Sequence, residues 1–203
     1  MKHKIALKKL EKLLAAPNFT SKEARACGVS PANLDYYIRS GEIERISRGL
    51  YRGAKAPEML NFQWEDLVSI VRNTQDGVIC LISALALYEL TEEIPRQHWI
   101  AIKNTTSCHV NPMVKVIRMR NHTLGKTIID IDGVRVPIFD RERTILDAFR
   151  YLSKETALKA LKTGLEQPRE KRIDINKLHS YAKKMKINLD PYLLALTIWM
   201  KQH

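Results

Sequence analysis

The chain has 203 residues, enough for one ordinary domain or two small ones whose cores need no disulfide or metal. Hydrophobic residues make up 45% and charged residues 28%, which excludes disorder over most of the length because there is ample apolar surface to offset chain entropy. Lys and Arg total 34 against 22 Asp and Glu, and the net charge of +12 favours a polyanionic partner.

The sequence predicts neither a membrane span nor a leader. Its longest apolar stretch, residues 78–90, is interrupted by Ser83 and Glu89 and is too short to cross a bilayer. The N-terminus lacks the uncharged core and the cleavage site of a signal peptide. The three Cys are odd in number and widely spaced, which favours reduced thiols. We therefore expect a cytoplasmic protein with no membrane partner.

The predicted elements begin with an amphipathic helix over residues 6–14, where the apolar side chains fall on one stripe. This helix ends at Pro17 and Asn18. Thr20 and Glu23 have the spacing of a capping box at the start of a short second helix. Gly28 ends the second helix, because glycine readily adopts the left-handed conformation past a helix end.

A third helix is predicted over residues 31–40, since Ser30 is a hydroxyl N-cap and Pro31 suits the first helical position. Each residue advances 100° around the axis, so one side of this helix is apolar and the other polar. The side predicted to be buried holds Leu34, Tyr37 and Ile38. The opposite side holds Ala32, Tyr36 and Arg39, flanked by Asn33.

Residues 42–52 predict two short strands around a turn at Arg48. The order of helix, turn, helix and basic hairpin indicates a winged helix-turn-helix, in which the third helix enters the major groove and the hairpin grips the flanking backbone. The residues predicted to bind DNA are Lys22, Ser30, Ala32, Asn33, Tyr36, Arg39, Arg45, Arg48 and Arg52.

The members of this set have different predicted roles. We expect the lysine and the four arginines to contact phosphates at the edges of the groove. We expect Asn33 to hydrogen-bond adenine, and Ala32 or Tyr36 to contact the methyl group of thymine. Two plainer interpretations stay open: an individual arginine is only a solvated charge, and Tyr36 covers an edge of the core.

Residues 53–57 combine Gly, Pro and small side chains and predict a domain boundary. We therefore assign residues 1–55 to the winged helix-turn-helix domain and residues 56–203 to a second domain. The first carries 12 Lys or Arg against 5 acidic residues, and the second carries 22 against 17. Most of the excess charge thus lies in the N-terminal quarter.

The second domain mixes helices and strands. Its predicted elements are a helix around residues 64–71, a buried helix over 83–90, strands over 97–103 and 113–120, a hairpin over 128–138, and helices that begin at Asp140, Ser153, Asp174 and Asp190. The predicted fold class is therefore α+β: an N-terminal winged helix-turn-helix followed by a mixed α/β domain with a small sheet and a helical C-terminal end.

Nothing in the second domain predicts catalysis. Arg143 and Asp147 are four residues apart on one helix, which predicts an ion pair. Cys108 and His109 are adjacent, but the Cys and His residues lack metal-ligand spacing. We expect no catalytic residue, no metal, no cofactor and no enzymatic activity.

Several segments resemble a known family when they are taken in order. They are residues 20–24, Gly28-Val29-Ser30, Leu34 with residues 38–43, and Ile46-Ser47-Arg48-Gly49-Leu50-Tyr51, followed downstream by residues 83–91 and 140–147. This arrangement is similar to the AbiEi antitoxins of type IV toxin-antitoxin systems. The resemblance covers most of residues 5–165.

The resemblance implies a sequence-specific repressor that binds inverted repeats in its own promoter and counteracts a toxin of the nucleotidyltransferase type. Its partners are then double-stranded DNA and a cognate toxin. Inverted repeats imply two copies on DNA, and we expect a monomer in solution. Two alternatives stay open: a nucleic-acid-processing enzyme with a basic substrate-delivery domain, and a protein-interaction module.

Overall fold

The structure is a computed structural model that describes residues 7–47, 49–56, 62–107 and 112–200. The chain divides into two compact units, residues 1–77 with 129–136, and residues 78–128 with 137–203. Helices accompany a three-stranded sheet and a five-stranded sheet, so the predicted α+β class is confirmed. The boundary predicted after residue 55 remains a prediction.

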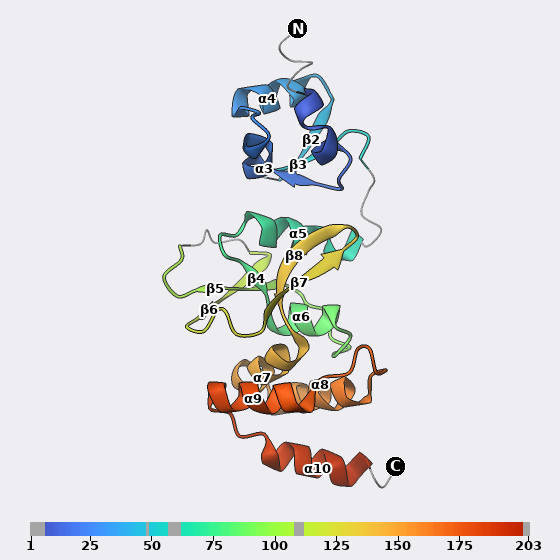
Figure 1. Cartoon of the computed structure of the whole chain (residues 1–203), viewed down its shortest axis with the longest axis vertical. Helices are drawn as coiled ribbons and strands as arrows, with labels where there is room; N and C mark the ends of the chain where they lie inside the picture. The colour runs from blue at the N-terminus through green and yellow to red at the C-terminus, as the bar shows by residue number, and fades with distance from the viewer. Residues whose placement is uncertain (1–6, 48, 57–61, 108–111, 201–203) are drawn as a thin grey trace. The chain divides into compact units, whose positions relative to one another are not determined.

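The first unit contains short helices and a small antiparallel sheet (Figure 1). In chain order its elements include α2 (Glu11–Leu14), β1 (Phe19–Thr20), α3 (Ser21–Ala26), α4 (Pro31–Arg39), β2 (Ile43–Ser47), β3 (Leu50–Gly53) and α5 (Phe62–Asn73). The strand order is β1-β3-β2. The predicted hairpin is thus confirmed, and β1 is a third strand that the sequence did not predict.

The local signals in this unit act as predicted. The Thr20 side chain accepts a hydrogen bond from the backbone N–H of Glu23, and the Glu23 carboxylate accepts one from the backbone N–H of Thr20 at 2.7 Å. These bonds satisfy donors that a helix start leaves unpaired. Phe19 precedes this capping box, is fully buried, and stacks on Tyr51 with the ring centres 5.8 Å apart.

The N-terminal helix differs from its prediction. Residues 7–9 are helical, Leu10 lies in a turn with its N–H bonded to the carbonyl of Leu7, and α2 begins at the next residue. The Leu10 side chain is fully buried, with Leu13 and Leu14 packed against the same core. The predicted apolar stripe therefore packs as expected, although a tighter turn interrupts the helix.

The second sheet combines parallel and antiparallel pairs in the order β6-β5-β4-β8-β7. Its strands are β4 (Val78–Ile79), β5 (His98–Lys103), β6 (Val114–Met119), β7 (Lys126–Ile131) and β8 (Val134–Phe139). Strands β5 and β6 are parallel, as are β4 and β8, whereas β4 and β5 are antiparallel. The strands predicted for residues 97–103 and 113–120 and the hairpin over 128–138 are confirmed.

The remaining helices are α6 (Leu81–Leu87), α7 (Arg141–Tyr151), α8 (Lys154–Glu166), α9 (Ile175–Met185) and α10 (Asp190–Met200). Helix α7 contacts α6, α8 and α9. The predicted N-caps are confirmed for Asp140, Ser153 and Asp174, each of which accepts a hydrogen bond from the first helical turn. No helix within the described ranges is long and apolar enough to cross a membrane.

Helix α6 lies two to three residues earlier than predicted. It begins after Cys80 and ends at Leu87, because Glu89 adopts a left-handed conformation with φ of 58°. The N–H of Leu90 then bonds to the carbonyl of Leu85 at 2.8 Å. This is the closure that commonly ends a helix, here made without glycine.

Candidate nucleic-acid interface

A tight turn sets the position of α4 against α3. Gly28 has φ of 77°, and the N–H of Val29 bonds to the carbonyl of Ala24 at 3.0 Å. Val29 is buried and joins Leu34 and Tyr37 of α4 in the core. Two helices joined by such a turn form the helix-turn-helix that sequence-specific DNA-binding domains use.

The face of α4 opposite this core is open to solvent. Ser30 caps the helix and accepts a hydrogen bond from the N–H of Asn33 at 3.3 Å. Asn33 is half-buried, and the exposed residues on this face are Ala32, Tyr36 and Arg39. Tyr36 is 47% exposed, yet its ring lies edge-on to that of Tyr37 at 5.6 Å. Tyr36 therefore both contacts the core edge and presents much of its ring to solvent.

The hairpin places its cations in different surroundings. Arg45 on β2 is exposed, whereas Arg52 on β3 is half-buried. Arg52 donates to the carboxylate of Glu44 at 2.8 Å and lies 3.8 Å from that of Glu65. Arg48 lies outside the described residues.

Backbone and side-chain contacts tie the hairpin to the helix-turn-helix. The N–H and the hydroxyl of Ser21 both donate to the carbonyl of Gly49, at 3.0 and 3.3 Å. The next residue, Lys22, is exposed in the first turn of α3. The hairpin and the start of α3 are thus held together, with Lys22 beside the junction.

Arg72 is a structural residue that the sequence did not single out. It belongs to α5 and bonds to the backbone carbonyl and side-chain oxygen of Asn18 and to the carboxylate of Glu23. Glu23 therefore serves both the capping box and this ion pair. The partners lie 49 and 54 residues from Arg72 along the chain, so no local pattern announces the contact.

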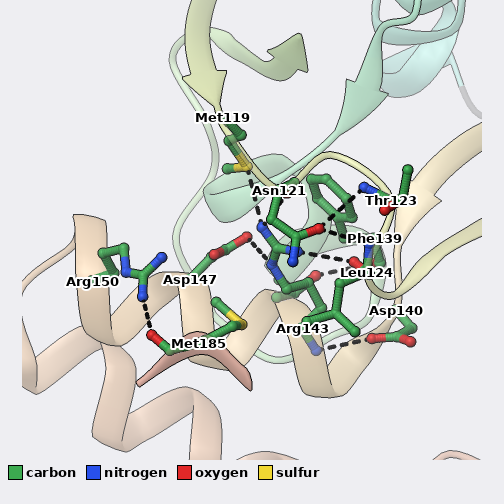
Figure 2. Close-up of polar contacts among 11 residues, drawn as sticks. Met119, Asn121, Thr123, Leu124, Phe139, Asp140, Arg143, Asp147, Arg150 and Met185 are labelled. Carbon is green, nitrogen blue, oxygen red and sulfur yellow. Dashed lines mark hydrogen bonds and ion pairs between the residues drawn. The ribbon is translucent and has the colours of Figure 1, made fainter. Parts of the chain in front are cut away.

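The second unit contains a buried polar network around Arg143. The predicted ion pair with Asp147 is confirmed, with Nε and Oδ2 2.9 Å apart and both side chains buried. Figure 2 shows that Arg143 also reaches back to the loop after β6, where it donates to the carbonyls of Asn121 at 3.0 Å and Leu124 at 2.9 Å. The pair therefore holds a loop in place.

Burial dominates the electrostatics of Asp147. It raises the pKa of this carboxyl from 3.8 to about 6, although Arg143 acts in the opposite direction. Oδ1 of Asp147 is buried and has no hydrogen-bond partner among the described residues. At neutral pH the carboxyl is ionised and paired, as expected for a buried pair with a structural role.

The parts of the chain that the structure describes contain no group of three or more His, Cys, Asp or Glu side chains placed to hold a metal ion. The Cys108-His109 dipeptide lies outside them. Cys80 is buried, and burial raises the pKa of its thiol well above the ordinary value. A thiol in this state is unsuited to nucleophilic chemistry.

Three helices, a glycine turn and a tied basic hairpin together define a winged helix-turn-helix, the fold of a large class of DNA-binding proteins. Residues 16–52 match the family described as "Transcriptional regulator, AbiEi antitoxin". Over these residues, the N-terminal part of the chain is similar to the AbiEi antitoxin family of transcriptional regulators. Comparison with curated proteins finds no match to this chain.

Proposed function

We propose that this protein is a sequence-specific DNA-binding repressor of its own promoter. Helix α4 enters the major groove and meets base edges through Asn33, Tyr36 and Ala32. The observation that carries this proposal is the solvent-open face of α4, which lies opposite a helix side that is buried in the core. A helix can read bases only through such an unoccupied face.

The cations around this face contact the DNA backbone in the proposal. They are Lys22, Arg39, Arg45, Arg48 and Arg52, and Ser30 at the α4 N-cap joins them where the helix N-terminus favours a phosphate. Arg39 and Arg45 are exposed. Their charge draws the protein to any duplex, and the bases under α4 select the operator.

A shift assay with the full chain tests this function. The protein should retard DNA taken from upstream of its gene at lower concentration than random duplex of equal length. Asn33→Ala should reduce this preference by roughly 1 to 3 kcal/mol, because it removes a base contact and leaves the phosphate contacts in place.

Lys12→Ala is the matched control, because Lys12 is an exposed residue of α2 in the same unit. It should leave the preference for upstream DNA unchanged. Equal affinity of the unaltered protein for upstream and random duplex would refute the repressor. A uniform loss of affinity in Asn33→Ala would instead make Asn33 a backbone contact.

We also propose that the chain is the antitoxin of a cytoplasmic toxin-antitoxin pair and is not itself an enzyme. The description of the matching family, which joins regulation and antitoxin activity, supports this role. The gene next to this one should encode a nucleotidyltransferase-type toxin. Co-expression should restore the growth of cells that the toxin arrests, and persistent arrest with both proteins present would refute the antitoxin role.

A further inference from the structure

A polar pocket lies where two parallel strands end. Strands β5 and β6 pair in register with Lys103 opposite Met119, so their carboxyl ends meet at one edge of the sheet. A cavity of about 410 Å³ opens there. We name it the β5–β6 pocket; its lining includes Lys103, Asn104 and Thr105 after β5, and Arg120, Asn121 and Thr123 after β6.

The chemistry of this lining is uniform. It offers an ammonium, a guanidinium, two amides and two hydroxyls beside the imidazole of His122, and no carboxylate is among the lining residues. These groups are donors that suit several oxygens of one anion, and guanidinium groups bind phosphate with two parallel hydrogen bonds. All six side chains are exposed or partly exposed, so a dissolved ligand can reach them.

The loops that carry these groups are fixed from outside the pocket. Arg118 on β6 donates to the carbonyl of Thr106 at 2.7 Å and so holds the residues that directly follow β5. The loop after β6 is held by Arg143 through the carbonyls of Asn121 and Leu124 (Figure 2). Asn121 Oδ1 accepts a hydrogen bond from the N–H of Leu124 at 3.1 Å. The NH₂ group of the same side chain is the part that can donate to a ligand.

His122 anchors the same loop to the core. It is buried, its Nε2 lies 3.3 Å from the carbonyl of Ala101, and its ring meets Phe139 edge-on. Preformed loops reduce the entropy that ligand binding must offset. Crevices at the carboxyl ends of parallel strands are also the common ligand sites of α/β sheets.

A larger cavity in the same unit lacks this uniformity. Its volume is about 760 Å³, and its lining mixes Glu89, Glu92, Glu93 and Glu166 with Lys159 and Lys162. Because both signs of charge line it, it indicates no single class of ligand. The β5–β6 pocket is lined by cations and polar groups without a carboxylate, so it indicates one class of ligand, an anion.

We propose that the β5–β6 pocket binds a phosphate group, carried by a free nucleotide or by a polynucleotide backbone. Lys103 and Arg120 supply the charge, and the amides and hydroxyls beside them orient the oxygens. This site is built from residues other than those of α4, and its existence does not depend on the repressor function.

Inorganic phosphate is the first probe, titrated at constant ionic strength into the full-length, ¹⁵N-labelled protein. Saturable shifts are expected for the backbone amides of residues 103–105 and 120–123. The double variant Lys103→Gln/Arg120→Gln should weaken binding roughly tenfold or more, since it removes two charge-assisted contacts. Both residues are exposed, so the variant should keep the fold and the dispersed spectrum of the unaltered protein.

The matched control is Lys183→Gln/Lys184→Gln, which removes the same charge from exposed positions on α9. It should change phosphate binding by no more than about twofold, through the long-range field alone. Absence of saturable shifts at residues 103–105 and 120–123 would overturn the proposal. Equal losses in the two double variants would also overturn it, because the anion would then respond only to net charge.

Two further probes separate the sources of the phosphate. Adenosine monophosphate and a random single-stranded oligodeoxynucleotide are titrated in the same way. Pocket shifts with the mononucleotide would support a free nucleotide, and pocket shifts with the oligonucleotide alone would support a backbone phosphate. Binding of the oligonucleotide without shifts at the pocket would show that the pocket does not bind a backbone phosphate. Loss of operator preference in Asn33→Ala with pocket shifts intact would show that the two sites are independent.

Discussion

At the scale of single residues, the cations of the hairpin are unequal. Arg45 is exposed, whereas Arg52 already faces the carboxylates of Glu44 and Glu65. A guanidinium with two acidic neighbours must give up those partners, or share them, before it can neutralise a phosphate. Sequence position alone would rank the two arginines together.

We therefore expect Arg45→Gln to lower the slope of log affinity against log salt by about 0.9, the contribution of one released counterion per phosphate contact. Arg52→Gln should lower this slope by distinctly less than Arg45→Gln does. Affinity for one duplex measured over a range of salt concentrations checks the difference. Equal changes in slope would show that the carboxylates leave the charge of Arg52 unaffected.

Asp147 makes stability depend on pH with an unusual sign. Its pKa is about 6 in the folded protein against an ordinary value of 3.8, so the folded state binds more protons between these values. By linkage, the stability from this site is fully present below about pH 4 and is lost as pH rises through about 6. Most structural carboxylates act in the opposite direction.

Asp147→Asn removes this titration. The stability of the unaltered protein relative to the variant should therefore increase as pH falls from about 7 to about 4, by at most about 1 kcal/mol per pH unit. Urea unfolding at several pH values measures it. Glu155→Gln is the control, because Lys159 lowers the pKa of Glu155 and its small effect must have the reverse sign. A pH-independent difference for Asp147→Asn would contradict the expectation.

At the scale of elements, the start of α7 is packed closely against the loop before β7. The N–H of Asp140, the N-cap, donates to the carbonyl of Gly125 at 2.7 Å. A Cβ on Gly125 would lie 2.6 Å from Cβ of Arg143 and 2.9 Å from Oδ1 of Asp140. Gly125 also has φ of 70°, so it meets both a conformational and a steric requirement.

Gly125→Ala should therefore lower the free energy of unfolding by about 2 to 4 kcal/mol, from the left-handed backbone together with the overlap. The comparison is Gly133→Ala in the β7–β8 turn, where φ is 81° and the added Cβ meets no described heavy atom within 4 Å beyond residues 132–134. That variant should lose only about 1 to 2 kcal/mol. Denaturant unfolding distinguishes them, and equal losses would mean that the loop yields to the added methyl group.

At the scale of the whole molecule, the net charge of +12 and the winged helix-turn-helix of the first unit bear on assembly. One such domain reads one half-site, and an inverted repeat presents two half-sites related by a twofold axis. Two monomers can occupy them and meet only on the DNA. Mutual repulsion of like-charged chains acts against association in its absence.

We expect one protein per half-site duplex and two per inverted repeat, with a monomer in free solution. Sedimentation of the protein alone and with each duplex gives these masses. A stable dimer without DNA would contradict the monomer. A single copy on the full repeat would show that the operator is not read as two equivalent halves.

In the N-terminal domain, the sequence by itself determined α3, α4 and the turn between them. Thr20 with Glu23, the turn at Gly28 and the cap at Ser30 all act within a few residues, so their physics is complete in the local sequence. The hairpin at residues 132–133 and the caps of α7, α8 and α9 followed in the same way. The similarity of residues 16–52 to the AbiEi family was recognisable from these signals in their order.

The tertiary structure alone decided what depends on distant partners. The parallel pairing of β5 with β6, which creates the β5–β6 pocket, joins strands whose own patterns do not specify a neighbour. The hydrogen bond from Arg143 to the carbonyl of Leu124 and the approach of Arg52 to the carboxylate of Glu65 at 3.8 Å likewise link residues that lie beyond the range of local patterns. Propensity and spacing act over one or two turns of chain, whereas these contacts exist only after packing has brought the segments together.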